Sequence, residues 1–229
     1  MLRLSIVLFL VLAVAGLVAV GLRHLPPQWD PRAPLDLTAP PNVITGLKLR
    51  RLSGDAEMCF LALETAPRAV RRVPDRASDG GCPIENAALL PASISLRPNT
   101  PVVTCRMAAA WTLFERNTLQ PAARAHLGAE IVAIRHLGAY ACRNVNHASS
   151  GRRSQHATAN AIDIAGFVLE NGREISLTTQ WRGEGGEAAF LRSVRDGACR
   201  WFRAVLGPDY NAAHHDHFHF DMGTWRICR

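Results

Sequence analysis

The sequence contains almost no lysine: of its 26 basic residues only Lys48 is a lysine, and the others are arginines. It also lacks a basic helix and any patch in which aromatic and basic residues interleave, so no nucleic-acid partner is expected. A formal net charge of +7 and a pI of about 9.7 favour an anionic lipid surface or an acidic polymer such as a cell wall. An arginine-rich surface with no specific partner is the simpler alternative.

No two cysteines form a CxxC motif, which disfavours a zinc ribbon. The six cysteines are spread over the whole chain that follows the N-terminal segment. An even number in such a distribution indicates disulfides formed in an oxidising compartment, although the sequence does not choose among the possible pairings. They are Cys59, Cys82, Cys105, Cys142, Cys199 and Cys228.

One long apolar run is present, from Leu4 to Leu22, and it contains no charged residue. A helix of this length, at ~1.5 Å per residue, nearly spans the roughly 30 Å core of a bilayer. No cysteine lies near its end, which argues against a lipoprotein. We predict one transmembrane helix over residues 1–22, in the inner membrane, with the rest of the chain in the periplasm or otherwise extracytoplasmic. A cleaved signal sequence is the alternative, with Ala13–Ala15 as the cleavage site, and it also exports the chain.

Residues 23–45 are rich in proline and predict a semi-extended tether that contributes no core element. A proline-rich ligand for another protein is the alternative, but no specific protein partner is predicted. We expect residues 46–229 to form one domain, since a chain of this length buries a sizeable core.

Hydrophobic spacing predicts the elements of this domain. Helices are expected over residues 54–66, from Thr104 as cap to Gly128 with a break or restart at Pro121, and over residues 187–206. Strands are expected over residues 92–96, 130–135, 160–169, 174–179 and 217–221, with a hairpin turn at residues 170–173. This order predicts an α+β fold in which helices flank an antiparallel sheet.

The C-terminal strand alternates histidine with phenylalanine. Because successive side chains of a strand face opposite ways, His217, His219 and Asp221 are expected on one face, and Phe218 and Phe220 on the core face.

In the earlier strand, Asp163 stands between Ile162 and Ile164. Burying a carboxylate there is unfavourable unless the carboxylate binds a ligand or a metal. His156, seven residues earlier, would fold back beside it.

His156, Asp163 and His219 together form a zinc-ligand set that leaves a fourth tetrahedral position for water, as in catalytic zinc sites. Zn²⁺ would acidify that water and polarise a carbonyl, and His217 is placed to act as the base. His214 would orient His217 or contact the transition state, and Asp221 would hold a histidine tautomer.

The alternatives are structural histidines, which are more common on strands than ligands, and incidental metal affinity of the C-terminal histidine cluster. The joint pattern of two separated motifs favours a metal site over both.

The segment Ser154-x-His156-x-x-Ala159-x-Ala161-x-Asp163 resembles the S-x-H-x-x-G-x-A-x-D motif of LAS-type zinc peptidases. Within that group the H-x-x-H-x-H pattern at residues 214–219 is similar to the murein endopeptidases, beside the D-alanyl-D-alanine carboxypeptidases. Residues 138–143 resemble the S-G-Y-R segment of the same group. The chain departs from the pattern at Ala159, where glycine is usual, and this affects backbone approach to the metal and substrate fit.

This resemblance implies that His156, Asp163 and His219 bind Zn²⁺ and that His217 is the catalytic base. It also implies that Ser154 and Arg143 contact the substrate, with the arginine binding a carboxylate.

From about residue 45 to residue 229 the chain also resembles the bacterial extensin-like C-terminal domain family. The features are Tyr140-Ala-Cys-Arg143, the Ser154–Asp163 motif, Cys199-Arg-x-Phe-x-x-Val-Leu-Gly-Pro208 and the final His-x-x-His-x-His.

Together these observations predict zinc-dependent hydrolysis of peptidoglycan peptides at amide bonds that involve D-amino acids, by a carboxypeptidase or an endopeptidase. The alternative is a non-catalytic peptidoglycan-binding or scaffold domain that retains a metal site. Ala159 favours the alternative, and the intact set of metal ligands favours the enzyme.

Overall fold

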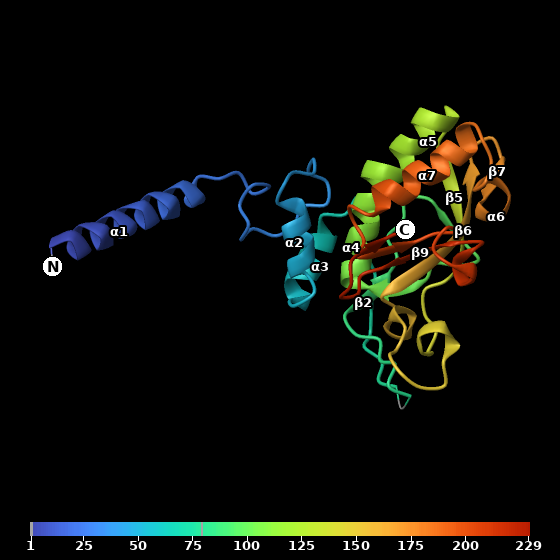
Figure 1. Cartoon of the computed structure of the whole chain (residues 1–229), viewed down its shortest axis with the longest axis horizontal. Coiled ribbons are helices and arrows are strands. Elements are labelled where there is room, and N and C mark those ends of the chain that lie inside the picture. The colour runs from blue at the N-terminus through green and yellow to red at the C-terminus, as the bar shows by residue number, and fades with distance from the viewer. Residues whose placement is uncertain (1, 79) are drawn as a thin grey trace.

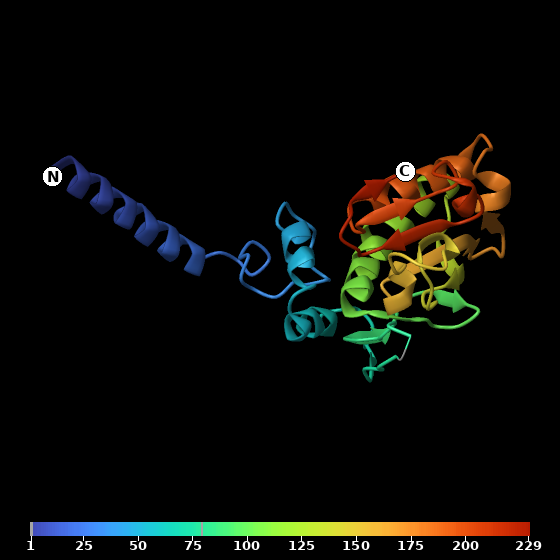
Figure 2. The same cartoon turned by 60° about the horizontal axis from the view of Figure 1, so that its bottom comes forward.

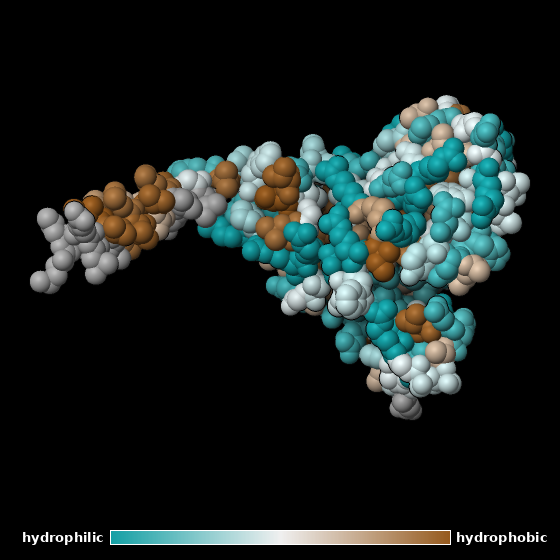
Figure 3. Space-filling view, in the orientation of Figure 1, coloured by the Kyte–Doolittle hydropathy of each residue, from teal (hydrophilic) through white to brown (hydrophobic). Residues whose placement is uncertain are grey.

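The computed structural model describes residues 2–78 and 80–229. Helix α1 (Leu2–Arg23) stands apart from the rest of the molecule in both orientations (Figures 1 and 2). Apolar side chains that the structure describes on this helix are exposed, with Phe9 at 71% and Leu17 at 74% (Figure 3). Over the described residues, no helix is found that is long and apolar enough to cross a membrane. Parts of the predicted anchor lie outside this description, namely residue 1 and several side chains of the run, so the anchor stays a prediction.

Two short helices, α2 (Thr45–Arg51) and α3 (Ala56–Glu64), lie between α1 and the main body (Figure 1). Leu35 and Leu37 of the proline-rich segment are buried in the main core, and the Leu37 amide donates to Thr65 Oγ1 at 2.8 Å. The prediction that this segment contributes no core element is therefore wrong at these two positions. Asp36 between them is exposed, so the two leucines reach the core from the same side of the chain.

The predicted helix that starts after Thr104 is confirmed in its cap and its end. Thr104 Oγ1 accepts from the Met107 amide at 3.3 Å at the start of α4 (Cys105–Phe114). A π-helical turn, η1 (Glu115–Leu119), leads into α5 (Gln120–Leu127). Pro121 lies in the first turn of α5, where a residue without a backbone N–H is tolerated. Gly128 ends α5 in the left-handed conformation, with φ of 64°.

The main sheet has seven strands in the order β10-β8-β9-β6-β5-β3, with β7 also paired to β6. Its inner pairs are antiparallel, but β3 pairs with β5 and β10 pairs with β8 in parallel. The prediction of an antiparallel sheet is therefore wrong, and the sheet is mixed. The reason for the β3–β5 pair is that α4 and α5 lie between these strands, and a helical crossover returns the chain in the same direction. The bounds are β3 (Ser95–Arg97), β5 (Ile131–Gly138), β6 (Ala161–Leu169), β7 (Glu174–Ser176), β8 (Ala204–Leu206), β9 (Phe218–Asp221) and β10 (Ile227–Cys228).

A smaller sheet of three antiparallel strands has the order β1-β2-β4, formed by β1 (Arg72–Val73), β2 (Ala87–Leu89) and β4 (Val102–Thr104). The strand expected over residues 174–179 ends at Ser176 and continues as the short helix α6 (Leu177–Gln180).

Helix α7 (Gly186–Ala198) is shorter than predicted, because residues 204–206 form strand β8 and pair with β9 and β10. The prediction of a helix up to Leu206 is wrong there. A short apolar run such as Ala204-Val205-Leu206 is compatible with a helix or with a strand. It forms a strand here because β9 and β10 lie beside it and pair with it.

The core face of the sheet packs on α4 through aromatic rings. Phe220 stacks on Phe202 at 4.8 Å between ring centroids and meets Phe114 of α4 edge-on at 5.4 Å. Phe218 and Phe220 are both fully buried, which confirms the predicted core face of the last strand. The strand begins at Phe218, so His217 lies just before it and the predicted start at His217 is one residue too early.

All six cysteines form disulfides: Cys59–Cys105, Cys82–Cys142 and Cys199–Cys228. Such bridges persist in oxidising compartments, so they support an extracytoplasmic location of this domain.

Replacing Phe220 by alanine is expected to lower the free energy of unfolding by about 3–5 kcal/mol, because the cavity between β9 and α4 cannot close. The matched control is Leu137→Ala, since Leu137 is 60% exposed, and its loss is expected to stay below about 1 kcal/mol. Urea denaturation of the oxidised protein measures both. Equal losses in the two variants would contradict this account of the core.

Candidate metal centre

Three segments far apart in the sequence bring the predicted ligands together. His156 comes from the 3-10 turn η3 (Gln155–Thr158), Asp163 from β6 and His219 from β9. In the β6–β9 pair Asp163 lies directly opposite His219. Cross-strand partners share a face of the sheet, so both side chains point away from the phenylalanine core.

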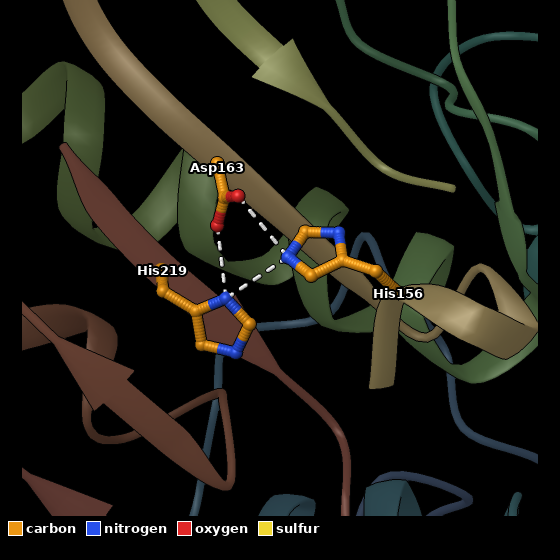
Figure 4. Close-up of side chains that lie close together, drawn as sticks. All are labelled: His156, Asp163 and His219. Atoms are coloured by element: carbon orange, nitrogen blue, oxygen red, sulfur yellow. Dashed lines mark hydrogen bonds and ion pairs between the residues drawn. The ribbon is translucent and has the colours of Figure 1, made fainter. Parts of the chain in front are cut away.

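The three side chains converge on one point (Figure 4). His156 Nε2 lies 3.1 Å from Asp163 Oδ2 and 3.1 Å from His219 Nδ1, and His219 Nδ1 lies 2.9 Å from Asp163 Oδ1. Ligands bound about 2.0 Å from a tetrahedral zinc ion stand about 3.3 Å from one another. The spacing therefore fits one metal ion.

Hydrogen bonds on the outer side of both rings fix their tautomers. His156 Nδ1 lies 3.2 Å from the Ala139 carbonyl oxygen, and His219 Nε2 lies 3.1 Å from Asp221 Oδ2. Both oxygens accept, so these nitrogens carry the protons and donate. In neutral rings the inner nitrogens, His156 Nε2 and His219 Nδ1, then present lone pairs to each other and to Asp163. This arrangement requires either a metal ion between them or further protons, which the rings then donate to the carboxylate. The predicted contact of Asp221 with a histidine of the cluster is confirmed.

The electrostatics of the cluster follow from burial and from these hydrogen bonds. Burial alone would lower the pKa of His219, but hydrogen bonds to Asp163 and Asp221 outweigh it and raise the pKa to about 9. Burial opposes ionisation of Asp163, yet hydrogen bonds from His156 and His219 hold its pKa well below the usual range. The site therefore favours a carboxylate surrounded by positive charge, whether that charge is a proton or a metal ion.

Asp163 and His219 of this cluster lie on the wall of a cleft of about 700 Å³. The predicted residues Arg143, Ser154, His214 and His217 line the same cleft, so the structure brings together the site residues that the sequence predicts. Their chemical roles stay predictions.

Ser154 also contacts a member of the cluster directly. Its hydroxyl accepts from the His156 amide at 3.3 Å and caps the turn that carries this histidine. The Ala141 amide donates to the His156 carbonyl at 3.0 Å, and the neighbouring Cys82–Cys142 disulfide holds that segment in place.

His217 has a carboxylate partner that the sequence reasoning missed. Its Nδ1 lies 2.8 Å from Asp216 Oδ1, and its Nε2 lies 3.7 Å from Asp163 Oδ1. The hydrogen bond from His217 lowers the pKa of Asp216. The one available indication in the sequence was the acidic residue directly before the histidine.

The ring of His214 lies beside two other histidine rings. Its centroid is 5.3 Å from that of His217 and 5.8 Å from that of His219. Burial, followed by the nearby His219 and His217, lowers the pKa of His214 to about 4. His214 is therefore neutral at neutral pH, and its Nδ1 contacts Asn211 Oδ1 at 2.7 Å.

Ala159, where the resemblance leads one to expect glycine, has a positive φ of 55°. Its carbonyl accepts from the Thr104 amide at 2.9 Å, and its amide donates to His156 O at 3.1 Å. Alanine adopts this left-handed conformation at a cost of roughly 1 kcal/mol relative to glycine. The turn that positions His156 is thus kept with alanine in place.

The comparisons with known proteins give one match. The sequence model of the family described as Extensin-like protein C-terminus matches residues 57–229. No curated protein and no solved structure matches the chain.

The purified protein is expected to contain about one zinc ion per chain, and the double variant His156→Ala/His219→Ala is expected to contain none, because it loses two of the three ligands. Elemental analysis by mass spectrometry measures this. His215→Ala is the matched control, since this exposed histidine belongs to the same segment but not to the cluster. Equal metal loss in the control would assign the binding to the histidine-rich segment as a whole.

Proposed function

This chain belongs to the extensin-like C-terminal family, and on that premise we propose that it is an exported zinc-dependent hydrolase of peptidoglycan peptides at bonds that involve D-amino acids. The observation that carries the proposal is the His156–Asp163–His219 cluster, of which Asp163 and His219 line the cleft. The resemblance of the two ligand motifs to LAS-type zinc peptidases supports the reaction class.

The cluster suits Zn²⁺ because it offers two imidazole nitrogens and a carboxylate and leaves the cleft side accessible. When bound, the ion would polarise the scissile carbonyl and lower the pKa of the attacking water.

His217 is the base in this proposal. Its Nδ1 is engaged by Asp216, so Nε2 is the atom that accepts the proton from the attacking water. The carboxylate of Asp216 also stabilises the imidazolium that forms, as in other histidine–carboxylate pairs. The position of Nε2 beside Asp163 keeps it next to the metal ligands.

The cleft also offers groups for binding the peptide. Arg143 presents a guanidinium, which suits a substrate carboxylate because the two groups match in charge and in fork geometry. His214, neutral at neutral pH, presents a hydrogen-bonding ring without adding charge beside the metal.

Purified protein is expected to cleave defined muropeptides, detected by liquid chromatography and mass spectrometry. His219→Ala is expected to abolish turnover, and His217→Ala to lower kcat by about 100-fold or more while the zinc content is unchanged. Asp216→Asn is expected to lower kcat and change its pH profile, because His217 loses its partner.

His215→Ala is the control and keeps full activity. Full zinc occupancy without turnover on any muropeptide, together with sedimentation on peptidoglycan that survives His217→Ala, would instead identify a binding module.

The domain works outside the cytoplasm in this proposal, and the N-terminal segment directs its export. The three disulfides and the exposed apolar side chains of α1 support this. N-terminal sequencing of protein from isolated membranes and periplasm is expected to find the product outside the cytoplasm. An intact N-terminus in the membrane indicates a single-pass anchor, and a shortened one in the periplasm indicates a signal sequence. Recovery only from the cytoplasm with reduced cysteines would refute export.

A further inference from the structure

A second cavity, of about 810 Å³, adjoins the metal cleft. Gln155, Gly223 and Thr224 line both spaces, so they form the boundary between them. The far walls come from the segment between α2 and α3 and from the start of α4. None of the metal ligands lines this second cavity.

Three arginines line it: Arg50 from the last turn of α2, Arg106 from the first turn of α4, and Arg203 from the segment before β8. Among the described residues, no carboxylate forms an ion pair with any of the three. Two of them are instead held by backbone oxygens. Arg106 Nη1 donates to Met222 O at 3.1 Å, and Arg203 Nη2 donates to Thr224 O at 2.7 Å. These bonds orient the guanidinium groups but leave their charge uncompensated.

The lack of acidic partners affects both the hydrogen bonding and the pKa of Arg106. Its Nε is buried and has no hydrogen-bond partner among the described residues. Burial, followed by the charges of Arg203 and Arg50, lowers its pKa, and Asp221 is the acidic group that acts in the opposite direction. Both oxygens of Asp221 are already engaged, by His219 Nε2 and by the Gly223 amide.

The acidic residues of the cavity wall do not neutralise the arginines. Asp55 accepts from the Met58 amide at 2.9 Å as the cap of α3, and Glu85 is exposed. Keeping like charges together, one of them largely buried, disfavours the folded state unless an anion joins them. Such an arrangement is typical of a binding site.

We propose that this cavity binds an oxyanion, the carboxylate or phosphate group of a ligand, between Arg50, Arg106 and Arg203. Guanidinium groups bind both chemistries through paired N–H donors. Because the boundary residues are shared, an extended ligand can lie in both spaces, with its anionic group here and another part beside the metal cluster. The oxyanion site itself needs neither metal nor hydrolysis.

The test is binding of inorganic phosphate and of succinate to the full-length, metal-free protein, by calorimetry and by thermal melting at constant ionic strength. Metal-free protein is used so that the probes cannot bind a metal ion, which keeps this result separate from the fate of the proposed hydrolase. We expect at least one probe to bind and to raise the melting temperature, through mass action on the folded state. Binding of phosphate alone or of succinate alone identifies which chemical group the site takes.

Arg106→Gln/Arg203→Gln is expected to raise the dissociation constant of the bound probe at least about tenfold. The same variant is expected to lose the increase in melting temperature that the probe causes. Arg50→Gln, at an exposed position that does not endanger folding, is expected to weaken binding to a smaller degree. The charge-matched control is Arg182→Gln/Arg192→Gln, two exposed arginines away from the cavity. Equal weakening in the control, unchanged binding in Arg50→Gln and in the double variant, or no binding of either probe to the natural protein would overturn the proposal.

Discussion

The pairing of β6 with β9 is the constraint on which the rest of the structure depends. In this register Asp163 faces His219, Ile162 faces Phe220 and Ile164 faces Phe218. A slip by one residue would turn every side chain to the other face, moving His219 into the aromatic core and a phenylalanine into the cleft. The aromatic packing on α4 and the geometry of the metal cluster are thus two results of one strand register.

Asp221 links the two polar regions of the molecule. Its carboxylate accepts from His219 on the side of the metal cluster, and its charge is the acidic one that acts on Arg106 behind it. One residue at the end of β9 therefore belongs to the support of a ligand and to the surroundings of the arginine cavity.

The residues of the candidate site could be predicted from the sequence, because short sequence patterns mark them. The alternation of histidine and phenylalanine in residues 217–221 specifies which side chains face the core, and Asp163 between two isoleucines marks a carboxylate that requires partners. Thr104 and Gly128 likewise mark helix ends through their own chemistry. The pairing of strands is different, since it depends on residues distant in sequence.

Most of the features that the sequence reasoning missed are of this second kind, and Asp216, the direct neighbour of His217, is the exception. The run 204–206 becomes a strand because β9 and β10 lie beside it, and the parallel pairs follow from how the chain crosses the sheet. Leu35 and Leu37 are buried in the main core, which the proline-rich composition of their segment does not predict. Asp216 is recognisable as a partner of His217 only once the ring of that histidine has an orientation.

The disulfide Cys199–Cys228 encloses strands β8 and β9 and the whole histidine segment within one covalent loop. A protease that cuts the exposed turn around Asn211 would therefore leave both fragments joined. The nicked chain would keep the mass of the intact chain, apart from one added water, until it is reduced. The strand that carries His219 would remain attached to the domain through Cys228. Its backbone hydrogen bonds to β6, which carries Asp163 and lies outside the loop, would then keep the β6–β9 register. The C-terminal bridge thus keeps His219 attached to the domain even after a backbone break in this loop.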